Sequence, residues 1–108
     1  MTAQNSVIIP SRLPKSCGFV RFAEFGALEI ELYDRGELAQ RFMGDDVATI
    51  YTVGVDDLPA LAAALNAGSV QTDGLPAALA AAFGDIDDLI QWLKDSGVAF
   101  STKVNPWA

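Results

Sequence analysis

Asp85, Asp87 and Asp88 are the residues whose type and spacing come closest to a chemical site. Grouped carboxylates can ligate Mg²⁺ or Ca²⁺ through oxygen, and Asp56–Asp57 forms a second acidic pair. The segment after Asp85 lacks the glycine and the distal glutamate of a calcium-binding hand. Both acidic groups also precede stretches of helical periodicity, where carboxylates cap helices and interact favourably with the helix dipole. Helix capping therefore explains these residues without a metal, and a metal-dependent enzyme is the weaker alternative.

The groups that most enzymes use for acid, base or nucleophilic chemistry are scarce. The 108-residue chain has no histidine, which excludes the Ser-His-Asp and Cys-His arrangements. Its single cysteine, Cys17, is expected to be an ordinary buried or partly buried thiol. The glycines stand singly and form no phosphate-binding pattern. We therefore predict a protein that is not an enzyme, with no catalytic residue, metal or cofactor.

The net charge of the chain says more about its partners than its catalytic groups do. Fourteen acidic and seven basic residues give a formal net charge of −7 at pH 7. Between Asp45 and Leu93 every charged residue is acidic. A strongly acidic protein is repelled by nucleic acid and anionic membranes and attracts basic partners. The lone cysteine favours a reducing compartment, and the chain shows neither a signal peptide nor an apolar run of about 20 residues, so we expect a cytoplasmic protein.

The elements that position these residues follow from hydrophobic periodicity. Residues 19–25 and 27–33 are β-like runs on either side of Gly26, which predicts an antiparallel hairpin. Residues 47–53, rich in β-branched side chains, predict another strand, and residues 98–104 predict one near the end of the chain. The short run Val7–Ile9 is either a first edge strand or a tether laid against the domain.

Helical patterns fill the interval between the last two predicted strands. One helix is expected after an N-cap at Asp56 or Asp57. A short alanine-rich helix is expected from Thr72 or Asp73 to Gly84, followed by one from Asp85 to a left-handed C-cap at Gly97. The order of elements predicts an α+β fold. It is a mainly antiparallel sheet of about four strands with two or three helices packed on one face. We expect one domain over residues 1–108, with residues 1–16 as a candidate irregular N-terminal arm.

One strand pattern suggests a surface for a basic partner. Glu29, Glu31 and Tyr33 alternate with apolar residues, so they share one side of a strand. Carboxylates beside aromatic rings suit contacts with Arg and Lys side chains, although a merely solvated strand face is an equal alternative. Asp45 and Asp46, in the turn before Tyr51, join this surface if the two strands are neighbours. The candidate partner-binding residues are Glu29, Glu31, Tyr33, Asp34, Glu37, Asp45, Asp46 and Tyr51.

Two stretches resemble a known group of proteins. Residues 26–53 contain Tyr33-Asp34-Arg-Gly and then Phe42-Met-Gly-Asp-Asp-Val before an aromatic-containing strand, and residues 83–98 look like a closing helix that leads into a strand. This pattern, over about half the chain, resembles the immunity proteins of bacterial contact-dependent growth inhibition systems. The resemblance implies a heterodimer with the C-terminal toxin domain delivered by a neighbouring cell. In many such systems that domain is a nuclease, whose active site the immunity protein blocks.

Three functions remain open at this stage. The first is an immunity protein that binds and neutralises a cognate basic toxin, with no direct contact to nucleic acid or membrane. The second is an acidic chaperone or a DNA mimic that acts on a secreted or nucleic-acid-binding protein. The third is the carboxylate–metal enzyme. A toxin gene immediately upstream would favour the first over the second, and calorimetry with Mg²⁺, Mn²⁺ and Ca²⁺ would test the third.

Overall fold

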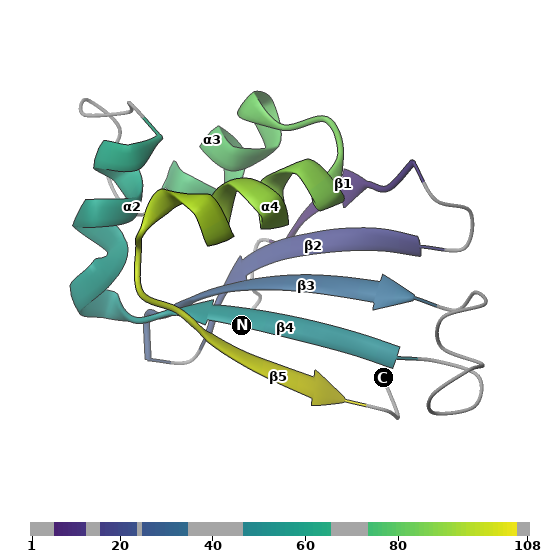
Figure 1. Ribbon diagram of the computed structural model, residues 1–108, viewed down its shortest axis with the longest axis horizontal. Coiled ribbons are helices and arrows are strands. Elements are labelled where there is room, and N and C mark those ends of the chain that lie inside the picture. Colours follow the sequence, from purple (N-terminus) through teal and green to yellow (C-terminus); the bar gives the residue numbers. More distant parts are fainter. Residues whose placement is uncertain (1–5, 13–15, 24, 35–46, 66–73, 106–108) are drawn as a thin grey trace.

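A computed structural model describes residues 6–12, 16–23, 25–34, 47–65 and 74–105. Within these residues the chain forms one antiparallel sheet in which each strand pairs with the next along the sequence (Figure 1). Its five strands are β1 (Val7–Pro10), β2 (Ser16–Phe22), β3 (Leu28–Asp34), β4 (Val47–Val53) and β5 (Ser101–Asn105). The α+β fold with an antiparallel sheet is as predicted from sequence, with five strands where about four were expected.

The additional strand comes from the N-terminal segment. Val7–Pro10 pairs with β2 along its whole length, so this segment is an edge strand of the sheet. Of the two alternatives for Val7–Ile9, the edge strand is confirmed, so residues 7–10 are not part of an irregular arm. Ile9 is 1% exposed, and burial of its side chain helps to hold the strand against the core.

The hairpin predicted around Gly26 is present, with its turn placed over residues 23–27. Gly26 has a φ of +87°, which glycine adopts at little cost. The amide of Ala23 donates to the carbonyl of Ala27 at 2.7 Å, and the amide of Gly26 donates to the carbonyl of Ala23 at 3.0 Å. These turn hydrogen bonds end β2 at Phe22, three residues before the end of the predicted run.

The helices follow the predicted order. A 3₁₀ turn, η1 (Val55–Asp57), leads into α2 (Leu58–Ala64), followed by α3 (Leu75–Ala82) and α4 (Ile86–Ser96). Helices α2 and α3 each have a proline in the first turn, where no amide donor is needed. Gly97 ends α4 in the left-handed conformation, with φ of +83°, as the sequence predicts. None of the helices in the described ranges is long and apolar enough to cross a lipid bilayer.

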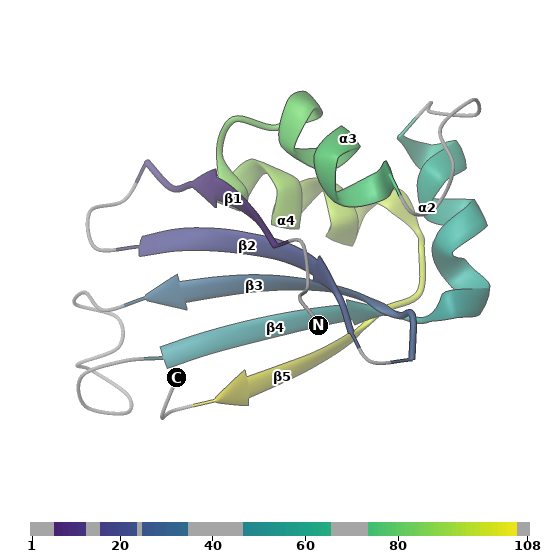
Figure 2. The ribbon, with the colours of Figure 1, turned by 180° about the vertical axis from the view of Figure 1, so that it is seen from behind.

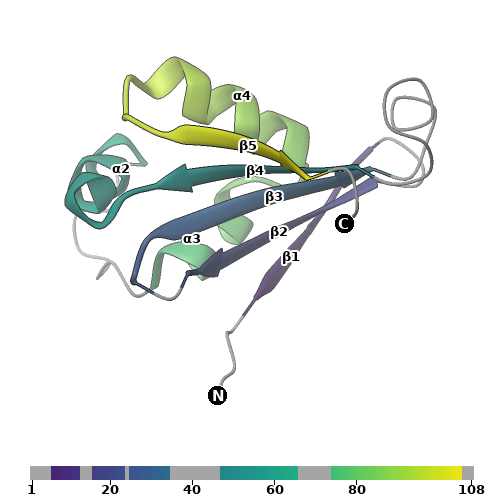
Figure 3. The same cartoon turned by 90° about the horizontal axis from the view of Figure 1, so that it is seen from below.

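Helices α3 and α4 pack on one face of the sheet, and α2 lies at the end of the sheet where β4 leads into η1 (Figure 1). Helix α3 contacts β1 and β2, and it lies beside them when the molecule is seen from behind (Figure 2). Helix α4 runs along the same side of the twisted sheet (Figure 3). The side chains between the two layers form one apolar cluster. Its fully buried large members are Ile9, Val20, Leu28, Ile30, Val53, Leu61, Leu75, Leu79, Ile86, Leu89 and Leu93.

The start of α4 approaches the sheet so closely that one strand position must be glycine. A Cβ atom placed on Gly18 would lie only 2.2 Å from Cγ1 of Ile86, which is far inside van der Waals contact. Gly18 and Ile86 are both buried, so an added Cβ atom and the Ile86 side chain have no free space in which to move apart. The missing side chain at Gly18 therefore sets the distance between α4 and β2.

We expect Gly18→Ala to lower the free energy of unfolding by about 1 to 3 kcal/mol, because the added methyl group overpacks the contact with Ile86. Urea titration would measure this change. Gly84→Ala is the matched control, since a Cβ atom there would have no neighbour within 4 Å. If Gly18→Ala proves as stable as Gly84→Ala, the close contact between α4 and β2 at Gly18 is contradicted.

Candidate partner-binding surfaces

The side of the sheet that faces away from the helices is called the open face here. Residues opposite one another in paired strands share a face, so the strand register defines its members. They are Ile8, Pro10, Cys17, Phe19, Arg21, Glu29, Glu31, Tyr33, Ala48, Ile50, Thr52, Ser101 and Lys103. Ile8 is 66% exposed, and Phe19 and Ile50 are half-buried. The open face is therefore partly apolar.

Two of the predicted partner-binding carboxylates are held by an arginine on this face. Arg21 Nε lies 3.1 Å from Glu29 Oε1, and Arg21 Nη1 lies 2.7 Å from Glu31 Oε1. All three side chains are at least three-quarters buried, so the ion pairs are screened by water less than exposed ones are. Together with Lys103, Arg21 balances the charge of the two glutamates. The open face is thus mixed and nearly neutral, where the sequence suggested an acidic face.

The other predicted residues divide between the two sides of the sheet. Tyr33 joins the two glutamates on the open face, opposite Cys17 and Ala48. Asp34 ends β3, where strand alternation places it on the helix side, and it accepts a hydrogen bond from Ser16 Oγ at 3.3 Å. Three further candidates, Glu37, Asp45 and Asp46, lie outside the described residues.

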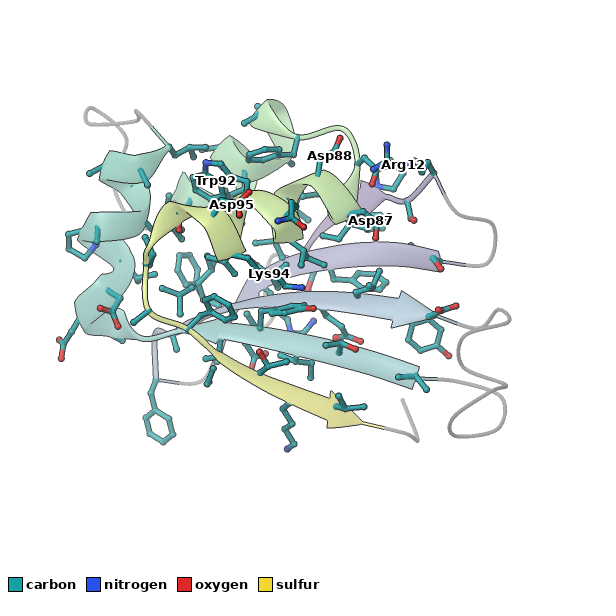
Figure 4. The ribbon with its side chains drawn as sticks, viewed as in Figure 1. Arg12, Asp87, Asp88, Trp92, Lys94 and Asp95 are labelled. Atoms are coloured by element: carbon teal, nitrogen blue, oxygen red, sulfur yellow. The ribbon has the colours of Figure 1, made fainter. Side chains whose placement is uncertain are left out.

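Tyr51 does not belong to the same surface as the glutamates, which corrects the expectation from sequence. It lies opposite Ile30, faces α4 and is only 8% exposed. Its ring is 5.9 Å from that of Phe100, and Lys94 Nζ lies 5.8 Å above it (Figure 4). Burial, helped by the negative charge of Asp87, raises the pKa of Tyr51 above its ordinary value. Tyr51 is therefore a core residue with a polar edge.

The aspartates at the start of α4 hold the end of β1 in place. Asp85 is the N-cap, accepting a hydrogen bond from the amide of Asp87 at 2.8 Å and one from the amide of Arg12 at 3.0 Å. Asp88 pairs with Arg12 Nη2 at 3.0 Å, and Asp87 accepts from Ser11 Oγ at 3.0 Å (Figure 4). The capping interpretation is confirmed for Asp85, and the two other acids attach the Ser11–Arg12 segment.

The equivalent acids before α2 behave differently. Asp57 occupies the N-cap position of α2, but its side chain makes no capping hydrogen bond, and none is made at the start of η1. Among the described residues neither Asp56 nor Asp57 forms an ion pair. The predicted N-cap position is thus confirmed at Asp57, but neither aspartate makes the capping hydrogen bond that was expected of it. Within the same ranges, no group of three or more Cys, Asp or Glu side chains is arranged to hold a metal ion.

A comparison with models of known protein families finds no match for this chain. Comparisons with curated proteins and with solved structures find none either.

We expect Asp85→Ala to destabilise the protein by about 1 kcal/mol, because α4 loses its capping oxygen and the backbone of Arg12 loses its acceptor. Asp57→Ala removes the same side chain from an N-cap that makes no such bond, and should change the free energy of unfolding by less than about 0.5 kcal/mol. Urea titration at pH 7 compares the two. Equal losses would contradict the assignment of Asp85 as the working cap.

The stability of the Asp85→Ala variant should also depend on pH differently from that of the wild type. Partial burial acts to raise the pKa of Asp85, but the hydrogen bonds from Asp87 and Arg12 and the charge of Arg12 outweigh it and hold the pKa below its ordinary value of 3.8. A lowered pKa in the folded state means that the stabilisation is present above pH 3.8 and is lost as the pH falls through the folded-state value. Asp85→Ala should therefore lose less stability than the wild type between pH 5 and pH 2.

Proposed function

We propose that this chain binds a basic protein and neutralises it, acting as the immunity protein of a bacterial toxin. The partner would be a cognate toxin domain that attacks nucleic acid, and the chain would block its active site in a heterodimer. We place the protein in the cytoplasm, where a delivered toxin would act and where the lone thiol of Cys17 would stay reduced.

The observation that carries this proposal is the open face of the sheet. A solvated sheet face normally alternates polar side chains with the core-facing ones, whereas here Ile8, Phe19 and Ile50 lie on the side away from the helices. Apolar side chains grouped on a surface and bordered by charged ones are typical of protein interfaces. The ion pairs of Arg21 keep the charges of this face satisfied when it leaves water.

The net charge of −7 supports a basic partner. A nuclease active site must attract phosphate, so it carries positive potential that an acidic protein can approach and occupy. Mutual attraction of this kind speeds association and weakens as salt screens it. The resemblance of residues 26–53 and 83–98 to immunity proteins points to the same class of partner.

The test uses the C-terminal domain of the protein encoded immediately upstream, purified as a catalytically inactive variant. Isothermal titration calorimetry should show a 1:1 complex whose affinity falls as NaCl rises from 50 to 500 mM. The wild-type chain should also protect cells from the active domain. No complex, or a complex with an affinity independent of salt, would contradict the proposal.

A matched pair of variants locates the contact. Ile50→Thr removes an apolar side chain from the open face, and we expect it to weaken binding by about tenfold, as for a contact at the centre of an interface. Val104→Thr likewise replaces an apolar β-branched side chain by threonine, on the other side of β5, where Val104 is 50% exposed, and should leave binding unchanged. Both substitutions retain β-branching, so the strands should remain intact.

A further inference from the structure

The end of the sheet that holds the β2–β3 turn carries the most exposed large apolar side chain of the described residues. Phe25 is 87% exposed at the tip of this turn. Its backbone is held on both sides, by the hydrogen bond from Ala23 to Ala27 and by the one from Gly26 to Ala23. Phe25 is thus an aromatic ring presented to water beside these hydrogen bonds. Exposing such a ring forgoes about 2 to 3 kcal/mol of burial, which the fold itself does not recover.

A second apolar side chain lies beside this turn. Val55, the first residue of η1, is 51% exposed. A Cβ atom placed on Gly26 would lie 3.4 Å from Cγ2 of Val55, so the turn and η1 are in contact. Phe25 precedes Gly26, so Phe25 and Val55 lie at the same end of the sheet on two segments that are far apart in the sequence. We call this part of the surface, with Asp56 and Asp57, the turn end.

The carboxylates of the turn end form no ion pair with any described residue. Elsewhere in the described chain Glu29 and Glu31 share Arg21, and Asp85 and Asp88 share Arg12. Asp56 and Asp57 have neither an ion-pair partner nor a capping hydrogen bond in the same part of the chain, and Asp56 is exposed. The turn end therefore combines an apolar tip with negative charge that the fold does not neutralise.

We propose that the turn end is the anchor of the complex, with Phe25 and Val55 entering an apolar depression of the basic partner while Asp56 and Asp57 pair with Lys or Arg side chains at its rim. This inference rests on the proposed function and names the surface that performs it. Aromatic side chains that fill a pocket and are surrounded by charge pairs dominate the energy of many interfaces. The turn end also borders the open face, because Arg21 and Glu29 form the second residue pair from the turn, after Phe22 and Leu28.

Charge decides between the possible occupants of this surface. A second copy of the chain would bring two surfaces with unpaired aspartates together, within a pair of proteins that each carry −7. Anionic lipid would meet the same repulsion. A basic protein offers the opposite charge and can supply the apolar contact as well, so it is the partner to which the observations commit.

The experiment compares Phe25→Ser with Val104→Ser, because both replace an exposed apolar side chain by the same polar one. The probe is again the inactive toxin domain encoded immediately upstream. Phe25→Ser should weaken binding at least about tenfold, while Val104→Ser binds as the wild type does. Urea titration should show that both variants keep the stability of the wild type, as expected for exposed positions. Phe25→Tyr retains the ring and should restore most of the affinity.

The contribution of Asp56 and Asp57 to binding is measured separately, through the rate of association. Asp56→Asn with Asp57→Asn should slow association several-fold at 50 mM NaCl and reduce the dependence of the rate on salt. Stopped-flow fluorescence measures both, with Asp95→Asn on α4 as the control of equal chemistry. If the wild type binds and Phe25→Ser binds equally well, the turn end is not the anchor, while the proposed function stands. If the wild type does not bind, both proposals are wrong.

Discussion

The fold depends on a strict division of the sheet into two faces. Each strand directs alternate side chains to one side. Helices α3 and α4 cover only that side, and α2 adds its apolar side chains to the same cluster. Gly18 makes the division possible where α4 begins, since any side chain there would separate Ile86 from the sheet. The consequences reach every candidate residue. Ile50 and Tyr51 are neighbours in sequence but lie on opposite sides of the sheet, the first on the open face and the second beneath α4.

Arg12 and Arg21 form the ion pairs between described residues. Arg12 is 65% exposed and joins acids at the start of α4, so its pairs are worth at most about 1 kcal/mol and serve mainly to position the N-terminal segment. Arg21 is largely buried between two glutamates, where losing the cation would leave two like charges side by side. Among the described residues, Asp56 and Asp57 at the turn end and Asp95 on α4 form no ion pair, and all three lie away from the centre of the open face.

The sequence predicts the local elements well because their signals are local. Residues 47–53 form a strand with the predicted bounds, Asp85 and Gly97 mark the ends of α4, and Gly26 lies in the turn of the hairpin. Contacts that depend on the strand register cannot be predicted from these local signals. Arg21 follows the same alternation as Phe19, yet only the pairing of β2 with β3 shows that it meets Glu29. Likewise Val47–Val53 has apolar residues on both sides, so its pattern alone does not say which side Tyr51 takes.

The central claim is that the chain meets its partner with the open face and the turn end, leaving the helices free. Hydrogen–deuterium exchange of the 1:1 complex with the upstream-encoded toxin domain tests this most directly. The claim predicts slower exchange on binding in the 23–27 turn and in η1, with α3 and the exposed amides of α4 unchanged. Protection confined to α3 and α4, with the turn and η1 exchanging as in the free protein, would contradict it.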